Sequence, residues 1–215
     1  VLSETAFLRN LRASIDSVRE ARDRVLAEQG ATTHRPAVTE IEQPPLNEHA
    51  WLEVMVQAVL PHQSPARFEP IEARPVCGCA ECARAHGLRI HLGEETRFHA
   101  AALCGPGSNA YEQTLGMFGL AETLLQQAGM EFRDVVRTWI HMRDIDRDYA
   151  DLNRARRSFF AARVIDPAPA STGSVAISRK AVISQPQANS GSFIMVMPGA
   201  RMLRMVTMML IDPMI

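Results

Sequence analysis

The chain has no long apolar run and no excess of charge of either sign. Its 215 residues include 23 basic and 24 acidic side chains, which gives a net charge of -1. Such a balance excludes the basic stripe that tracks nucleic-acid phosphates. No apolar stretch approaches the roughly 18 residues that span a bilayer, and residues 1–10 lack the charged start and apolar core of a signal peptide. We therefore expect a cytoplasmic protein with no nucleic-acid partner and no membrane partner.

Cysteine is also scarce: the chain has four, and three of them lie together as Cys77, Cys79 and Cys82. In a reducing compartment such a cluster indicates metal or free thiols rather than a disulfide framework. A fourth ligand would close a tetrahedral zinc site. The candidates for it are His86, His91, His99 and Cys104. Because the spacing is not that of a standard zinc finger and no second pair follows, we favour unligated thiols and expect no cofactor.

A composition of 47% hydrophobic and 22% charged residues is typical of a soluble globular protein. Near the N-terminus, a 3-4-3 apolar spacing predicts one helix over residues 1–29, with Arg22 in the only polar slot of its stripe and Gly30 as the C-cap. The stripe contains Leu8, Leu11, Ile15, Val18 and Val25. We favour a helix that packs on its own domain over an oligomerisation or partner helix.

The rest of the N-terminal part is rich in proline. Residues 31–45 are polar and contain three prolines, which favours a linker. Asn47 can cap a second helix over residues 49–60, and a second connection over residues 61–75 leads to the cysteines. We therefore expect residues 1–87 to form an N-terminal helical segment with linkers and the cysteine cluster.

After Gly87 strands and helices alternate. Strands are predicted over residues 88–92, 96–103, 134–142, 171–177, 193–197 and 202–211, and helices over residues 110–128 and 148–162. Residues 93–95 carry a hairpin turn, and Gly129 ends the first of these helices. This order predicts an α+β domain over residues 88–215, with its helices packed on one face of a sheet.

This order, with several residues in register, resembles the Rid (YjgF) superfamily between about residues 97 and 173. In that family a long helix opens with Gln-Thr and closes with L-x-x-A-G, a D-V-V-(K/R)-T strand follows, and the next helix has a central Asn and paired aromatics. The matching residues here are Gln113, Thr114, Leu125, Ala128, Gly129, residues 134–138, Asn153, Phe159 and Phe160. The resemblance implies a Rid-like fold assembled as a trimer or pseudo-trimer, with pockets between adjacent units.

Two departures distinguish the chain within that superfamily. Deaminating members carry a P-A-R-S-T sequence whose Arg clamps the substrate carboxylate, whereas this chain has residues 169–173 as P-A-S-T-G. Neither Ser171 nor Ala170 can offer the paired hydrogen bonds of a guanidinium. The P-A-S-T-G sequence, the R-T-W strand and a helix with Tyr149, Asn153 and Arg156 are similar instead to the chorismatase branch.

That similarity implies a hydrolase or lyase that acts on a chorismate-like carboxylated substrate in a biosynthetic pathway, without metal. A carboxylic acid would protonate the enol-ether methylene while Arg residues hold the carboxylates. The acid is expected near the last strands, but residues 193–211 contain no convincing match. The catalytic residue is therefore unknown: either the acid lies beyond Ile215 or the protein lacks it. The alternatives are a Rid-type imine or enamine deaminase, a related intermediate-processing enzyme, and a non-catalytic ligand-binding or assembly protein.

The candidate substrate-binding residues follow from these patterns. Arg137 and Trp139 alternate on one strand, so their side chains share a face, which His141 continues. An Arg beside an aromatic ring suits a planar carboxylated ligand. The segment Ser171, Thr172 and Gly173 offers hydroxyl and backbone donors to an anion, and Cys104 ends the strand that lines the pocket in the family. A buried, inert Cys is the other interpretation of Cys104.

Overall fold

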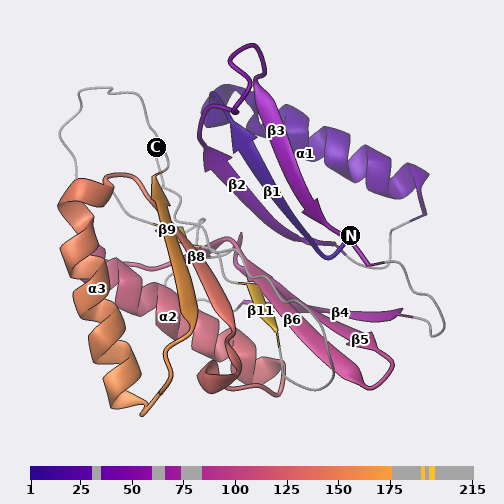
Figure 1. Ribbon diagram of the computed structural model, residues 1–215. Coiled ribbons are helices and arrows are strands. Elements are labelled where there is room, and N and C mark those ends of the chain that lie inside the picture. The colour runs from indigo at the N-terminus through magenta and orange to yellow at the C-terminus, as the bar shows by residue number, and fades with distance from the viewer. Residues whose placement is uncertain (31–34, 60–65, 74–83, 176–189, 192–193, 197–215) are drawn as a thin grey trace.

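The computed structural model describes residues 1–30, 35–59, 66–73, 84–175, 190–191 and 194–196, which form two sheet-containing regions (Figure 1). The first region contains β1 (Ser3–Leu8), α1 (Leu11–Glu28), β2 (Ala37–Glu42) and β3 (Leu52–Gln57). The second begins with β4 (Ala66–Glu72), β5 (His86–Leu92), β6 (Glu95–Ala101), β7 (Leu103–Cys104) and α2 (Ala110–Gln127). It continues with β8 (Arg137–Met142), α3 (Ile145–Ala162), β9 (Ala170–Val175), β10 (Ser190–Gly191) and β11 (Ile194–Val196).

The N-terminal sheet has the strand order β2-β1-β3. Strand β1 pairs in parallel with β2 and antiparallel with β3. Helix α1 connects the two parallel strands and begins at the cap Asn10, whose side chain accepts a hydrogen bond from the Ala13 amide. The helix packs Val18 on Ala6 and Leu8 of β1. The predicted C-terminal cap is confirmed, because Gly30 follows the helix with φ +66.

Arg22, the polar residue in the apolar stripe of α1, bonds the helix to the sheet. Its guanidinium donates to Glu4 (2.6 Å) and to Glu40 (3.1 Å), and Arg19 also binds Glu40. The side chains of Arg22, Glu4 and Glu40 are at most 13% exposed, whereas that of Arg19 is 31% exposed. Burial lowers the pKa of Arg22, but the hydrogen bonds and charges of Glu4 and Glu40 outweigh burial and raise it. The stripe is thus interrupted by a charge that the sheet neutralises.

We expect Glu40→Gln to lower the free energy of unfolding by about 3 kcal/mol, because it removes the carboxylate that the largely buried Arg22 and the partly exposed Arg19 share. Urea denaturation followed by circular dichroism measures the change. Asp16→Asn is the matched control, because Asp16 lies 3.9 Å from Arg19 but its side chain is 97% exposed. Equal stabilities of the two variants would contradict the structural role of Glu40.

The structure corrects the prediction of an N-terminal helical segment. Residues 3–8, predicted as the start of a helix, form β1, and residues 37–42 of the predicted linker form β2. The predicted helix over residues 49–60 is wrong, because residues 52–57 form β3 beside β1. Asn47 does accept from a nearby amide, that of His49, but it caps a turn rather than a helix. Tertiary strand pairing here overrides a helix-compatible pattern.

The second region confirms the α+β prediction. Strands β11, β6, β5 and β4 pair in that order, and the β5–β6 hairpin turns at Gly93 with φ +62. Strand β4 lies in a segment that was predicted to be a connection, and it pairs with β5 along its whole length. The division of the chain at residues 87 and 88 stays a prediction.

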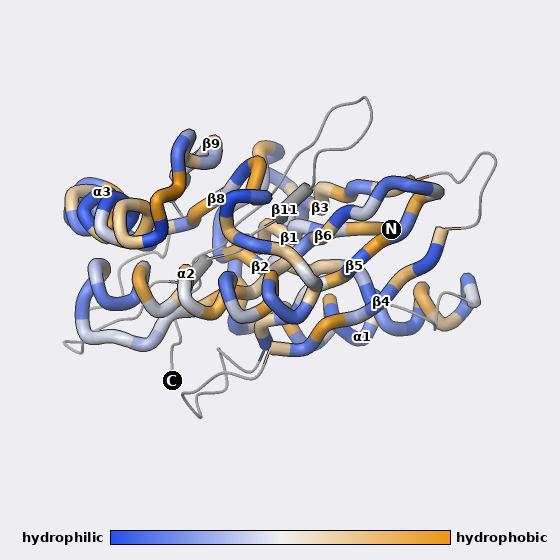
Figure 2. The backbone as a smooth tube through the Cα atoms, turned by 90° about the horizontal axis from the view of Figure 1, so that it is seen from below, coloured by the Kyte–Doolittle hydropathy of each residue, from blue (hydrophilic) through white to orange (hydrophobic). Residues whose placement is uncertain are grey.

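Helices α2 and α3 pack side by side on one side of this region (Figures 1 and 2). Helix α2 begins at the cap Asn109, whose side chain accepts a hydrogen bond from the Glu112 amide. The core between helices and strands is rich in aromatic rings, with Phe118 5.1 Å from Phe159 and 5.7 Å from Phe132 between ring centroids. Both helices form close to their predicted bounds, because each has an apolar stripe that is buried in this core. Among the described residues no helix is long and apolar enough to cross a membrane.

Candidate functional site

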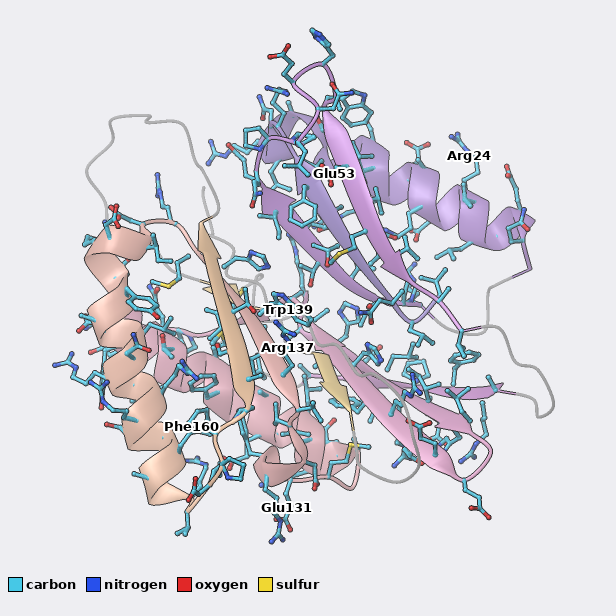
Figure 3. The ribbon with its side chains drawn as sticks, viewed as in Figure 1. Arg24, Glu53, Glu131, Arg137, Trp139 and Phe160 are labelled. Atoms are coloured by element: carbon cyan, nitrogen blue, oxygen red, sulfur yellow. The ribbon has the colours of Figure 1, made fainter. Side chains whose placement is uncertain are left out.

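Strands β8 and β9 pair in parallel and present their side chains to two different surroundings. Ile140 and Met142 of β8 are buried in the core beneath α2 and α3. Because side chains alternate along a strand, Arg137, Trp139 and His141 point to the opposite side. Figure 3 agrees, since Arg137 and Trp139 lie on the side of β8 away from α3. The predicted shared face of these residues is therefore confirmed.

Arg137 is held in place on this face by two neighbours. Its Nη2 donates to Thr172 Oγ1 at 3.1 Å. Thr172 lies on β9 directly opposite Trp139 of β8. The Cζ of Arg137 lies 4.8 Å from the centroid of the Trp139 ring. No carboxylate of the described residues lies within ion-pair distance of Arg137, and its buried Nε has no hydrogen-bond partner. The Arg137 guanidinium is therefore held in one position and keeps N–H groups that could bind a ligand.

Ser171 and Gly173 are separated from this cluster. Register places them on the alternate positions of β9, so they face α3 rather than Arg137. A Cβ built on Gly173 would lie 3.8 Å from Ile145 and 3.9 Å from Tyr149, which confirms that side. The five predicted residues of the two strands thus do not form one site: Arg137, Trp139 and Thr172 share one face, and Ser171 and Gly173 share the other.

The α3 side of β9 carries a shallow hollow of about 370 Å³. It is lined by Ile145, Asp146, Tyr149 and Gly173. Of these, the site predicted from sequence included only Gly173. The hollow lies where α3 begins beside the strand, so helix and strand residues far apart in the sequence meet there.

Arg156, further along α3, is a second half-buried cation. Its Nη1 donates to Asn153 Oδ1 at 3.5 Å, its Nε has no hydrogen-bond partner, and no described carboxylate pairs with it. Burial lowers its pKa, and the neighbouring Tyr149 opposes that effect. The i, i+4, i+7 spacing of Tyr149, Asn153 and Arg156 marks one helix face, and this spacing is the signal that could have added Arg156 to the predicted site.

The second region contains two buried histidines. His141 is 4% exposed on the Arg137 face of β8, and His99 is 2% exposed on β6, between Leu88 of β5 and Ile194 of β11. Among the described residues, neither ring nitrogen of His99 has a hydrogen-bond partner. Burial lowers the pKa of each histidine to about 3, and the charge of Arg97 adds to the effect at His99. Both are therefore neutral at pH 7.

Cys104 is buried and forms no disulfide within the described part of the chain. It ends β7 and pairs with Ser190 of β10, a strand that also contacts β8. It is thus close to the Arg137 strand but is not shown against Arg137 itself. The three clustered cysteines and residues 197–215, which include the predicted strand over residues 202–211, lie outside the described residues. Among the residues that are described, no group of three or more His, Cys, Asp and Glu side chains is placed to hold a metal ion.

Comparison with known proteins gives a likeness of fold only. No family model matches the chain, and no curated protein is significantly similar to it. A solved structure of a YjgF/YER057c/UK114 family member from Mycobacterium tuberculosis is 20% identical, with a TM-score of 0.36, and covers 53% of this chain and 89% of its own. A YjgF family protein from Neisseria meningitidis is 16% identical, with a TM-score of 0.34, and covers 54% and 84%.

A third solved structure, a YjgF family protein from Streptococcus pyogenes, is 18% identical, with a TM-score of 0.34, and covers 46% of this chain and 75% of its own. These values describe an arrangement of strands and helices and say nothing of chemistry. The chain is an α+β protein that, over about half of its length, is similar in fold to proteins of the YjgF family.

Proposed function

We propose that the chain is an enzyme of Rid type that binds a small carboxylated substrate against Arg137, and that it acts on a chorismate-like compound by hydrolysis or elimination. The observation that carries the proposal is the Arg137 guanidinium, which is oriented by Thr172 and Trp139 and has no described carboxylate partner. A cation kept in place with unused N–H donors is suited to an anionic ligand. The Trp139 ring beside it suits a flat, unsaturated ring.

The structure favours this binding role over deamination. The residue at the position of the family's carboxylate-clamping Arg is Ser171 or Ala170, and Ser171 faces α3. Arg137 is a different cation on the neighbouring strand. It lies on the face opposite Ser171 and is the register partner of Ala170, so it does not occupy the clamp position itself. Protonation of an enol ether also needs an acid. No described carboxylic acid lies within ion-pair distance of Arg137, so the proposal assigns substrate binding and no proton donor to these residues.

The test is pyruvate release from chorismate by the whole protein. We expect Arg137→Ala to lower kcat/KM about 10- to 100-fold, because one charge-assisted hydrogen-bonding site contributes about 1.5–3 kcal/mol. Arg133→Ala is the matched control, since Arg133 is 72% exposed and pairs with Glu131. Its activity should equal that of the unaltered chain.

Binding can be measured separately from turnover. The chain has two tryptophans, so Trp51→Phe leaves Trp139 as the only one, and its fluorescence should change when chorismate binds. If this signal saturates without pyruvate release, the protein is a binder and the hydrolase or lyase is excluded. If neither chorismate binding nor pyruvate release occurs, the proposal is wrong. Formation of a 2-ketoacid from a freshly generated enamine would support the deaminase alternative.

A further inference from the structure

Strand β3 is the outer strand of the N-terminal sheet, and its second edge pairs with no described strand. In an antiparallel pair, alternate residues bond to the partner strand. The Arg9 amide donates to the Trp51 carbonyl, and the register continues this alternation through Glu53 and Met55. The backbone groups of Leu52, Val54 and Val56 therefore point to the free edge. Their N–H and C=O groups are available for another strand.

This edge is also apolar. Val54, Met55 and Val56 are 43%, 41% and 49% exposed. Leu52 packs with the residues beneath α1, so Val54 and Val56 lie on the helix side of the sheet, beyond the part that α1 covers. Lysine, proline and bulges commonly protect edge strands against pairing, and β3 contains none of them. Four of the six residues of β3 are apolar, and its one charged side chain, Glu53, accepts a hydrogen bond from the Leu46 amide. An exposed apolar edge of this kind marks a surface for contact with another chain.

The loop before β3 carries two further exposed apolar side chains. Arg9 donates to the carbonyls of Ala50 (3.0 Å) and Glu48 (2.7 Å) and thus fixes the loop. Trp51, at the end of this loop, is 54% exposed, and Leu46, near its start, is 93% exposed. A large aromatic side chain on a fixed loop loses little conformational entropy when it is covered. The loop is therefore prepared for a protein contact.

We propose that β3 pairs with the β3 strand of a second copy of this chain, antiparallel and about a two-fold axis at Val54. The edge-facing residues permit this register, which sets Val54 opposite the partner subunit's Val54 and Leu52 opposite the partner subunit's Val56. Glu53, the only charged residue of β3, lies opposite the partner subunit's Met55. The strand is self-complementary because no like charges face each other. A six-stranded sheet across two subunits results.

The experiment measures native mass by light scattering after size-exclusion chromatography of the full chain. We expect Val54→Lys and Val54→Glu each to halve the native mass, because the two-fold axis places two like charges opposite each other. Mixing the two variants in equal amounts should restore the mass, since Lys then faces Glu. Val164→Lys is the matched control, a valine that is 90% exposed beyond α3, and it should keep the unaltered mass.

Restoration by mixing supports a contact at Val54 and also shows that both variants fold. If the unaltered chain already has the mass of the Val54 variants, the pairing is wrong. If both variants keep the unaltered mass, the pairing is likewise overturned. Halved masses that mixing does not restore overturn the two-fold at Val54.

Discussion

Replacing Gly105 with alanine is expected to lower the free energy of unfolding by about 3 kcal/mol. An added Cβ would lie 1.7 Å from the Gln113 carbonyl oxygen and 2.5 Å from the Met117 amide nitrogen. Both atoms belong to the backbone of α2, so no side-chain rotation can relieve the overlap. The segment after β7 and the helix must move apart, and the packing of Met117 in the core is lost with them. Urea denaturation with tryptophan fluorescence measures the effect.

Gly119→Ala is the control for this prediction, because Gly119 lies within α2 and a Cβ added there meets no other atom within 4 Å. Alanine has a higher helix propensity than glycine, so this variant should be more stable by about 1 kcal/mol. Glycine-to-alanine substitution should therefore lower stability at Gly105, which packs against α2, and raise it at Gly119, which lies within α2. If both variants lose stability equally, the close approach at Gly105 is not the cause.

Acidification is expected to destabilise the fold through His99 and His141. In the folded chain burial lowers the pKa of both to about 3, against an ordinary value of 6.5. Between these values the unfolded chain binds protons that the folded chain does not. Stability is therefore complete above pH 6.5 and falls as the pH decreases toward 3. Each histidine contributes a slope of about 1.4 kcal/mol per pH unit.

Urea denaturation at pH 7.5, 6.0 and 5.0 measures this slope. His99→Leu should remove roughly half of the histidine contribution, because leucine has no proton to gain and the site offers the ring no hydrogen bonds. His49→Leu is the control, since the His49 side chain is 88% exposed. An unchanged slope in His99→Leu would show that the ring is hydrated in the folded chain.

The parts that the sequence predicted well are those whose signal is local. The two helices predicted over residues 110–128 and 148–162 form close to those bounds. Each is capped, and each has an apolar stripe that packs against a neighbouring sheet. The hairpin at Gly93 has its own turn signal. The shared face of Arg137 and Trp139 also follows from strand periodicity alone.

The parts that were missed depend on distant partners. Residues 52–57 are compatible with a helix, and only β1, some 50 residues earlier in the chain, makes them a strand. Arg22 interrupts a helical stripe for no local reason, and Glu4 and Glu40 of the sheet explain it. Strand pairing and buried charge pairs of this kind join distant segments, so they produce no periodic pattern in the sequence of any one segment.

By itself, then, the sequence determined the helices of the second region, the α+β class and the face that Arg137 shares with Trp139. The tertiary structure decided the N-terminal sheet and divided the predicted site, because register sets Thr172 beside Arg137 and turns Ser171 and Gly173 toward α3. The physical reason is that periodicity fixes which side chains of one strand share a face, whereas the pairing of two strands fixes which side chains meet across them.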